Sequence, residues 1–326
     1  MTKSKLTSDN ICESSKGKKN VLFFLRRANQ LVRLPERIWH YIHFFLLLSQ
    51  ANNNYNTLNQ VNTNLQLAIR AAILGGREIM QVYALPAAQH ELEYKADASP
   101  LTLADRRSHE AIMSVLAPTA IPVLSEEGAH LPYEERRAWT NLWVVDPLDG
   151  TKEFVKRNGE FTVNIALLEG TVPVLGVMFE PNTNTLYYGE VGVGAFRVKV
   201  DENGDFAEAP VALPLAKEFE PGEYVVVVSR SHLSPETEEY IDILREDFEK
   251  VTMVQAGSAL KIARVAEGLA MEYPRFGPTM EWDTAAGDAI VRAAGGRMVR
   301  AEDDLPLVYN KADLHNPWFV VKSKLI

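Results

Sequence analysis

The spacing of apolar residues predicts two amphipathic helices at the start of the regularly patterned part of the chain. Within residues 64–83 the apolar side chains that recur at helical spacing are Leu65, Ala68, Ile69, Ala72, Ile73, Ile79 and Met80. Such positions share one face of a helix, so we predict a helix over 64–83 that packs this face against a core. We expect a second helix over 103–116, after Pro100.

Short apolar runs bounded by turn residues then predict strands at 121–125, 142–146, 161–168, 172–179, 185–190 and 194–200. The close spacing of the last four favours an antiparallel meander. Residues 201–221 are rich in Asp, Glu, Gly and Pro, which is typical of a crossover between domains. Beyond them strands (224–229, 251–255) and helices (235–249, 258–267, 283–294) alternate, which indicates a smaller α/β unit.

The first sixty residues are patterned differently. They combine basic residues with short apolar runs between residues 21 and 48, and these runs fall short of the roughly 20 residues that span a bilayer. We expect residues 1–60 to be a disordered extension, with membrane association through residues 21–48 as the alternative. A signal peptide that ends near Ser49-Gln50-Ala51 is less favoured, because its basic region would be unusually long.

Composition limits the class of protein. At 326 residues and 46% hydrophobic content, the chain can form two core-bearing domains or one large one, and we place them at 61–207 and 208–326. The net charge of −9 includes a basic first sixty residues, so the body is acidic and no nucleic-acid partner is expected. Cys12 is the single cysteine, which favours a reducing compartment. We expect a cytoplasmic protein, with peripheral contact to the cytoplasmic face of the inner membrane as the alternative.

The segment Leu142–Thr151 carries the most informative chemistry. Asp146 ends an apolar strand, and Asp149 follows it after a turn through Pro147. Two carboxylates at this spacing can face a common point, which would need a cation because buried like charges are costly. The alternative is an ordinary β-turn in which each Asp bonds only to its own backbone.

Three further segments carry acids where strands end or helices begin. Glu126 and Glu127 follow a short apolar strand, Asp105 lies three residues after Thr102, and Asp283 opens an Ala-rich helix. Each has a structural alternative: a solvated pair of acids, a capping box and a helix N-cap, respectively.

Taken together and in this order, the motifs Thr-x-x-Asp, Glu-Glu, Asp-Pro-x-Asp-Gly-Thr and Trp-Asp-x-Ala-Ala-Gly resemble the inositol-monophosphatase-like superfamily of Mg-dependent, lithium-sensitive phosphatases. The resemblance covers residues 64–326 and implies a layered αβαβα sandwich. It combines a mainly antiparallel α+β part, which binds the metals, with a smaller α/β part that contacts the nucleotide. Five further segments are similar to the bacterial 3'(2'),5'-bisphosphate nucleotidases: Val227–His232, Gly257–Lys261, Tyr273–Thr279, Val308–Lys311 and Asn316–Phe319.

The resemblance also implies roles for single residues. Two or three Mg²⁺ ions are expected: one on Glu126, Asp146 and the Leu148 carbonyl, and one on Asp146, Asp149 and Asp283. Asp105 and Thr151, with Glu126, would orient and deprotonate the attacking water. The expected substrate contacts are Gly150, Thr151, His232, Ser258, Lys261, Arg275 and Asp283. For His232 the alternative is a cap of the following turn, and for Lys261 a solvated helix position.

The function that this resemblance implies is hydrolysis of adenosine 3',5'-bisphosphate to AMP and phosphate by metal-activated water, as part of sulfur metabolism. The alternatives are an inositol monophosphatase or a fructose-1,6-bisphosphatase of the same fold. A non-catalytic regulator that binds nucleotide or metal is disfavoured, because Asp105 and Thr151 are both present.

Overall fold

The computed structural model describes residues 62–86, 89–90, 92–94, 100–129, 131–216, 218–230 and 233–326. Residues 62–326 form one compact unit. The predicted extension at 1–60, with its apolar runs at 21–48, lies outside the described residues, and so does His232. Among the helices in the described part of the chain, none has the length and apolarity needed to cross a membrane.

Two long helices begin the unit, as the apolar spacing predicted. They are α3 (Thr63–Tyr83) and α4 (Leu103–Leu116), and they pack on each other. The Asn62 side chain accepts a hydrogen bond from the Asn64 amide and so caps α3. The apolar stripe of α3 is buried against β5 and β6. The short elements of this region are β1 (Glu93–Tyr94), β2 (Pro100–Leu101), the 3₁₀ turn η2 (Ala117–Thr119), α5 (Tyr133–Arg136) and α6 (Thr151–Val155).

A seven-stranded sheet follows, in which the strands stand in sequence order. Its strands are β3 (Val123–Ser125), β4 (Asn141–Asp149), β5 (Thr162–Glu169), β6 (Val172–Glu180), β7 (Thr185–Glu190), β8 (Gly194–Lys199) and β9 (Val211–Leu213). All neighbours are antiparallel except β3 and β4, which confirms the predicted meander. The prediction missed β9 inside the expected crossover, because this strand is three residues long and buries only Leu213.

A second sheet of five strands has the order β11-β10-β12-β14-β13. Its strands are β10 (Glu223–Ser229), β11 (Lys250–Ala256), β12 (Glu272–Arg275), β13 (Arg297–Arg300) and β14 (Phe319–Lys322). The accompanying helices are α7 (Pro235–Asp247), α8 (Leu260–Ala266) and α9 (Glu281–Ala293). The sequence pattern missed β12, β13 and β14, since each has four residues and contains charged side chains, which leaves too short an apolar signal.

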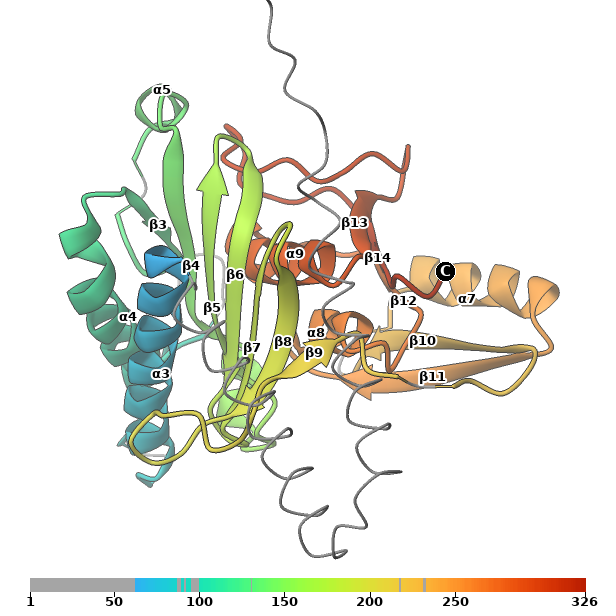
Figure 1. Cartoon of the computed structure of the whole chain (residues 1–326), viewed down its shortest axis with the longest axis horizontal. Coiled ribbons are helices and arrows are strands. Elements are labelled where there is room, and N and C mark those ends of the chain that lie inside the picture. Colours follow the sequence, from blue (N-terminus) through green and yellow to red (C-terminus); the bar gives the residue numbers. More distant parts are fainter. Residues whose placement is uncertain are drawn as a thin grey trace, which may run out of the picture. The chain divides into compact units, whose positions relative to one another are not determined.

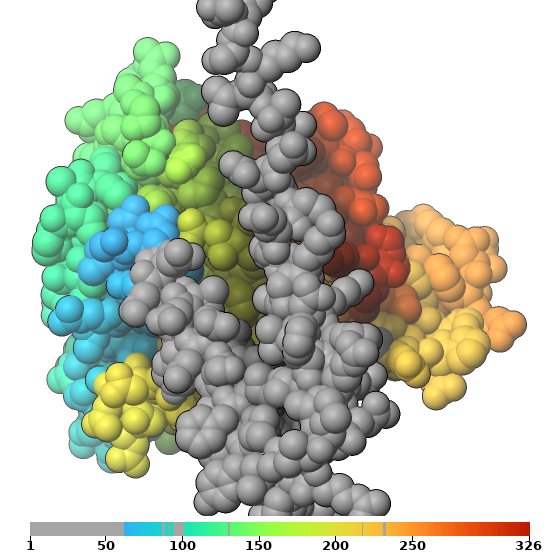
Figure 2. Space-filling model, in the orientation of Figure 1, coloured from blue at the N-terminus to red at the C-terminus, as the bar shows by residue number. Residues whose placement is uncertain are grey.

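These elements form five layers in the order α3 and α4, the seven-stranded sheet, α8 and α9, the five-stranded sheet, and α7 (Figure 1). Figure 2 shows the first helical layer in blue and green on one side of the unit and α7 in orange on the other. The arrangement is a layered αβαβα sandwich, which confirms the predicted fold.

The predicted division at residues 61–207 and 208–326 stays a prediction. Strand β9 follows this boundary in the sequence, yet it pairs with β8 and extends the first sheet. The middle layer joins the two sheets, because α9 contacts β5 and β6 of the first sheet and β13 of the second.

Helix α9 lies against the seven-stranded sheet at close range, and this approach requires a glycine. A Cβ built on Gly176 of β6 would collide with the backbone carbonyl of Ala286 on α9. The opposing helix face is made of small residues, among them Ala286 and Ala289. Close packing here fixes α9 relative to β4, β5 and β6.

We therefore expect Gly176→Ala to lower the free energy of unfolding by about 1–3 kcal/mol, because the methyl group overpacks the joint between β6 and α9. Urea unfolding followed by circular dichroism measures this change. Gly128→Ala is the matched control, since the nearest atoms to its new Cβ lie at an ordinary 3.4 Å. Equal unfolding midpoints for the two variants would contradict the close packing of this joint.

Candidate active site

The site is built on a break in strand β4. Pairing with β5 shifts register between Asp146 and Asp149, so both side chains come free of a regular ladder. Asp146 Oδ1 accepts a hydrogen bond from the Leu148 amide at 3.0 Å. Gly150 has φ of 92°, a conformation that favours glycine, and it turns the chain into α6. The β-turn alternative is thus correct for one oxygen of Asp146.

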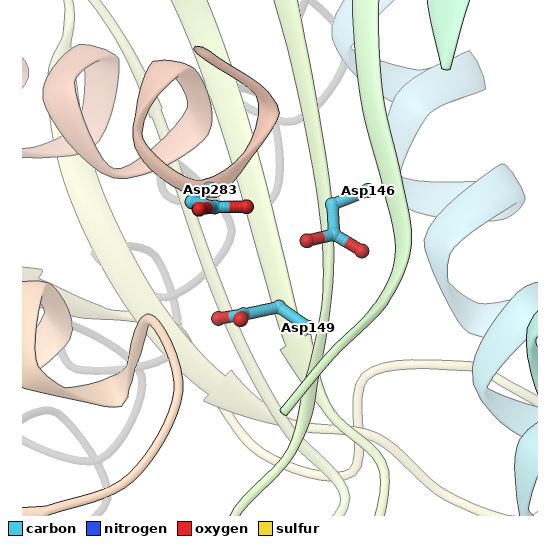
Figure 3. Close-up of side chains that lie close together, drawn as sticks. All are labelled: Asp146, Asp149 and Asp283. Carbon is cyan, nitrogen blue, oxygen red and sulfur yellow. The ribbon is translucent and has the colours of Figure 1, made fainter. Parts of the chain in front are cut away.

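Three carboxylates converge where β4 meets the first turn of α9 (Figure 3). One oxygen each from Asp146, Asp149 and Asp283 lies within 4.8 Å of the others. Asp146 is buried, and the other two are partly exposed. The structure therefore brings together residues 137 positions apart in sequence, as the motif order predicted.

Burial makes this carboxylate cluster electrostatically demanding. Desolvation, followed by the charges of Glu126 and Asp149, raises the pKa of Asp146 well above its ordinary value. Desolvation and the neighbouring Asp149 raise the pKa of Asp283 to about 8. A divalent cation would relieve this repulsion, and a donor set made only of oxygen suits Mg²⁺. The residues present thus fit a magnesium site.

Hydrogen bonds orient the outer two carboxylates. Asp149 Oδ2 accepts from the Ser258 hydroxyl and from the Ala259 amide, both at 2.5 Å. The Ser258 and Thr162 hydroxyls lie 2.8 Å apart, which extends the chain of hydrogen bonds to β5. Asp283 Oδ2 accepts from the Met280 amide at 2.8 Å, so this residue caps α9 and still takes part in the cluster.

Glu126 lies beside this cluster rather than within it. It follows β3, and its amide donates to the Val145 carbonyl at 3.1 Å, next to Asp146. Its charge raises the pKa of both Asp146 and Asp283, so it faces the cluster. Its carboxylate does not belong to the three whose oxygens lie within 4.8 Å of one another.

Asp105 and Thr151 form a pair at the start of α6. Thr151 Oγ1 lies 3.2 Å from Asp105 Oδ1 and 3.2 Å from the Leu148 carbonyl, and it can donate to either. Asp105 is buried, and its Oδ2 accepts from the Thr102 amide and hydroxyl at 2.7 and 2.6 Å. The predicted capping box is present, and the second oxygen of Asp105 is directed to Thr151. Burial is the main cause that raises the pKa of Asp105 to about 7.

A cleft of about 780 Å³, open mouth included, adjoins the cluster, a size that accommodates a nucleotide. Of the predicted substrate contacts it is lined by Gly150, Ser258, Lys261, Arg275 and Asp283. Sequence reasoning missed other lining residues, namely Lys152, Glu153, Ser229, Tyr273, Thr279 and Thr284. Most of them adjoin a recognised motif, so proximity to the motifs was the available signal.

Two basic side chains supply positive charge to this cleft. Lys261 is 8% exposed, donates to the Ser258 carbonyl at 2.6 Å and lies 5.6 Å from the Tyr273 ring. Burial lowers its pKa to about 8. Arg275 donates from Nη2 to the Pro278 carbonyl at 3.0 Å, while its buried Nε has no hydrogen-bond partner among the described residues. A donor of this kind can bind an anion such as phosphate.

The polar residues of β5 were missed for a different reason. Thr162 belongs to a run predicted as a buried strand, and its hydroxyl reaches Ser258 beside Asp149. The signal was the occurrence of a hydroxyl and an amide, Thr162 and Asn164, in an otherwise apolar strand. Only the strand register reveals that these positions face the site.

Curated relatives with this pattern include two named 3'(2'),5'-bisphosphate nucleotidase CysQ. The relative from Escherichia coli strain K12 is 43% identical over 249 residues, which cover 76% of this chain and 94% of the relative. The relative from Salmonella typhimurium is 46% identical over 225 residues, covering 68% and 85% of the two chains.

Solved structures agree with the fold. CysQ from Bacteroides thetaiotaomicron, described as a bacterial member of the inositol monophosphatase family, is 49% identical with a TM-score of 0.74. The match covers 81% of this chain and 98% of that one. The SuhB protein of Bartonella henselae shares the fold at 24% identity and a TM-score of 0.62, over 81% and 95% of the two chains. A family model described as the inositol monophosphatase family matches residues 61–323, and the chain therefore belongs to that family.

Proposed function

We propose that this protein is a Mg²⁺-dependent 3'(2'),5'-bisphosphate nucleotidase that hydrolyses adenosine 3',5'-bisphosphate to AMP and phosphate. The observation that carries the proposal is the convergence of Asp146, Asp149 and Asp283 beside the Asp105–Thr151 pair and a cleft with two cations. The names of relatives that are 43–46% identical support the same substrate class. A cytoplasmic location and a place in sulfur metabolism remain predictions.

The carboxylate cluster would hold the metal. Asp146, Asp149 and Asp283 offer the ligand oxygens, with Glu126 and the Leu148 carbonyl as further donors at its edge. When bound, two Mg²⁺ ions acidify a water and neutralise charge on the phosphoryl and leaving oxygens. Asp146 lies between the other donors, so we assign it the bridging position. These roles of the ligands do not depend on a third ion.

Asp105 and Thr151 would receive the proton of the attacking water. The Thr151 hydroxyl can donate its proton to Asp105 Oδ1 while Thr151 Oγ1 accepts a proton from water. Threonine alone is a weak base, whereas a carboxylate with a pKa of about 7 is well matched to neutral pH. The Thr102 hydrogen bonds hold Asp105 in the orientation that this transfer needs.

The cations of the cleft favour a substrate with two phosphates. One phosphate would meet the carboxylate cluster with its metals, and Lys261 and Arg275 would bind the second, which is not cleaved. Inositol monophosphate has no second phosphate, so it would leave this part of the cleft unused. Fructose 1,6-bisphosphate has two, and is the stronger alternative on charge alone.

A substrate panel with a matched variant tests this assignment. We expect Lys261→Ala to raise KM for adenosine 3',5'-bisphosphate by about tenfold and KM for 3'-AMP much less, because only the bisphosphate loses a charge partner. Lys156→Ala, an exposed lysine outside the cleft lining, is the control. Phosphate release is measured for both nucleotides, inositol 1-phosphate and fructose 1,6-bisphosphate. Faster turnover of either sugar phosphate than of the bisphosphate nucleotide would refute the proposed substrate.

Asp146→Asn tests the metal centre. We expect kcat to fall by at least about a thousandfold, since a bridging ligand supports several kcal/mol of transition-state stabilisation. The variant should fold and melt at a temperature no lower than the metal-free parent, because it removes a charge that burial disfavours. Phosphate release and thermal unfolding are the two readouts, and activity near that of the parent would exclude Asp146 as a ligand.

The stabilisation of the protein by Mg²⁺ should depend on pH. Asp283 titrates near 3.8 when unperturbed and at about 8 in the fold, so between these values the folded metal-free protein binds more protons than the unfolded chain. Its stability therefore falls as pH rises through this window, with the loss complete above about pH 8. Mg²⁺ binds only deprotonated carboxylates, so its effect on Tm should be larger at about pH 8 than at about pH 6. Thermal melts with and without Mg²⁺ measure both, and an equal gain at the two pH values would contradict this origin.

A further inference from the structure

One face of strand β5 changes character where it passes the carboxylate cluster. The side chains of Thr162, Asn164, Ala166 and Leu168 alternate onto the same face of the sheet. Ala166 and Leu168 belong to the apolar core that includes residues of α9, so this face lies under that helix. The polar pair therefore stands at the end of the face nearest the first turn of α9, where the cluster lies.

Asn164 is the unusual member of this face. It is 1% exposed, and neither Oδ1 nor Nδ2 has a hydrogen-bond partner among the described residues. Burying an amide without hydrogen bonds is costly, and nearly all buried polar side chains in folded proteins have partners. An apolar residue would fill this position at lower cost unless the amide has a specific task.

Strand register places this amide beside the central ligand. Asn164 is the direct antiparallel partner of Asp146, and on its other side it pairs with Met178 of β6. Directly opposed side chains lie on one face with Cβ atoms about 4.5–5.5 Å apart. The amide thus lies next to the Asp146 carboxylate, on the sheet side of the cluster.

The ligands differ in how they are supported. Asp149 has two donors on Oδ2, from Ser258 and Ala259, and Thr162 of β5 stands behind that contact. For Asp146, the Leu148 amide donates to Oδ1, so Oδ2 is the oxygen open to a further donor from the sheet. Thr162 and Asn164 alternate along β5 as Asp149 and Asp146 do along β4, since they are their register partners.

We propose that Asn164 is a positioning residue of the metal centre, whose amide donates to the Asp146 carboxylate and accepts from metal-bound water. This inference rests on the metal site of the proposed function. Asn164 acts through Asp146 and does not contact the substrate. The amide fixes the direction of the bridging carboxylate, as residues behind metal ligands do, and loss of such a partner costs roughly 10- to 100-fold in metal affinity or activity.

Two variants separate this role from a structural one. Asn164→Leu replaces the amide by an apolar group of similar size, and Asn164→Ala removes it without risk of overpacking. Met178→Leu is the control, because it alters the neighbouring position on the same face without changing polar groups. The Kd of the full-length protein for Mg²⁺ is measured by calorimetry in the absence of substrate, together with the Tm of the metal-free protein.

We expect both Asn164 variants to bind Mg²⁺ at least about tenfold more weakly than the parent, while Met178→Leu binds as the parent does. Metal-free Asn164→Leu should melt no lower than the parent, because it buries no unpaired amide. A Kd for Mg²⁺ equal to that of the parent in both Asn164 variants would overturn the inference, whatever their stability. Failure of the parent itself to bind Mg²⁺ would refute the proposed metal site instead, so the two failures are distinguishable.

Discussion

The mutual repulsion of three carboxylates at the junction of β4 and α9 is the constraint on which the rest of the site depends. Asp146, Asp149 and Asp283 offer oxygens within 4.8 Å of one another, and burial raises the pKa of Asp146 and Asp283. A protein holds such a cluster only where a cation or protons balance it. The cluster is therefore costly to the metal-free fold and useful only when a divalent ion binds.

The surrounding architecture keeps this cluster in place. Gly176 lets α9 approach the sheet closely enough for Asp283 to meet the ligands of β4. The register break after Asp146 frees the turn that leads to Thr151, and the buried carboxyl of Asp105 stands behind that hydroxyl. On the other side, Lys261 and Arg275 give the cleft the charge that a phosphorylated substrate requires. Metal binding, proton transfer and substrate binding thus share one short stretch of β4.

Much of this was predictable from the sequence, because the informative signals are local. Helical spacing located α3, and the short apolar runs located the meander. The order of the acidic motifs correctly indicated that Asp146, Asp149 and Asp283 converge. The four-residue strands of the second sheet were missed because their burial is decided by neighbours distant in sequence. Asn164 was missed for the same reason, since only strand register sets it opposite Asp146. The role of His232 stays a prediction, as that residue lies outside the described part of the chain.

The most direct test of this account is a crystal structure of the protein grown with Mn²⁺, with anomalous scattering used to locate the metal. The account predicts an anomalous peak bonded by one oxygen each of Asp146, Asp149 and Asp283. A catalytically active protein whose crystals contain no metal at these three carboxylates would contradict it.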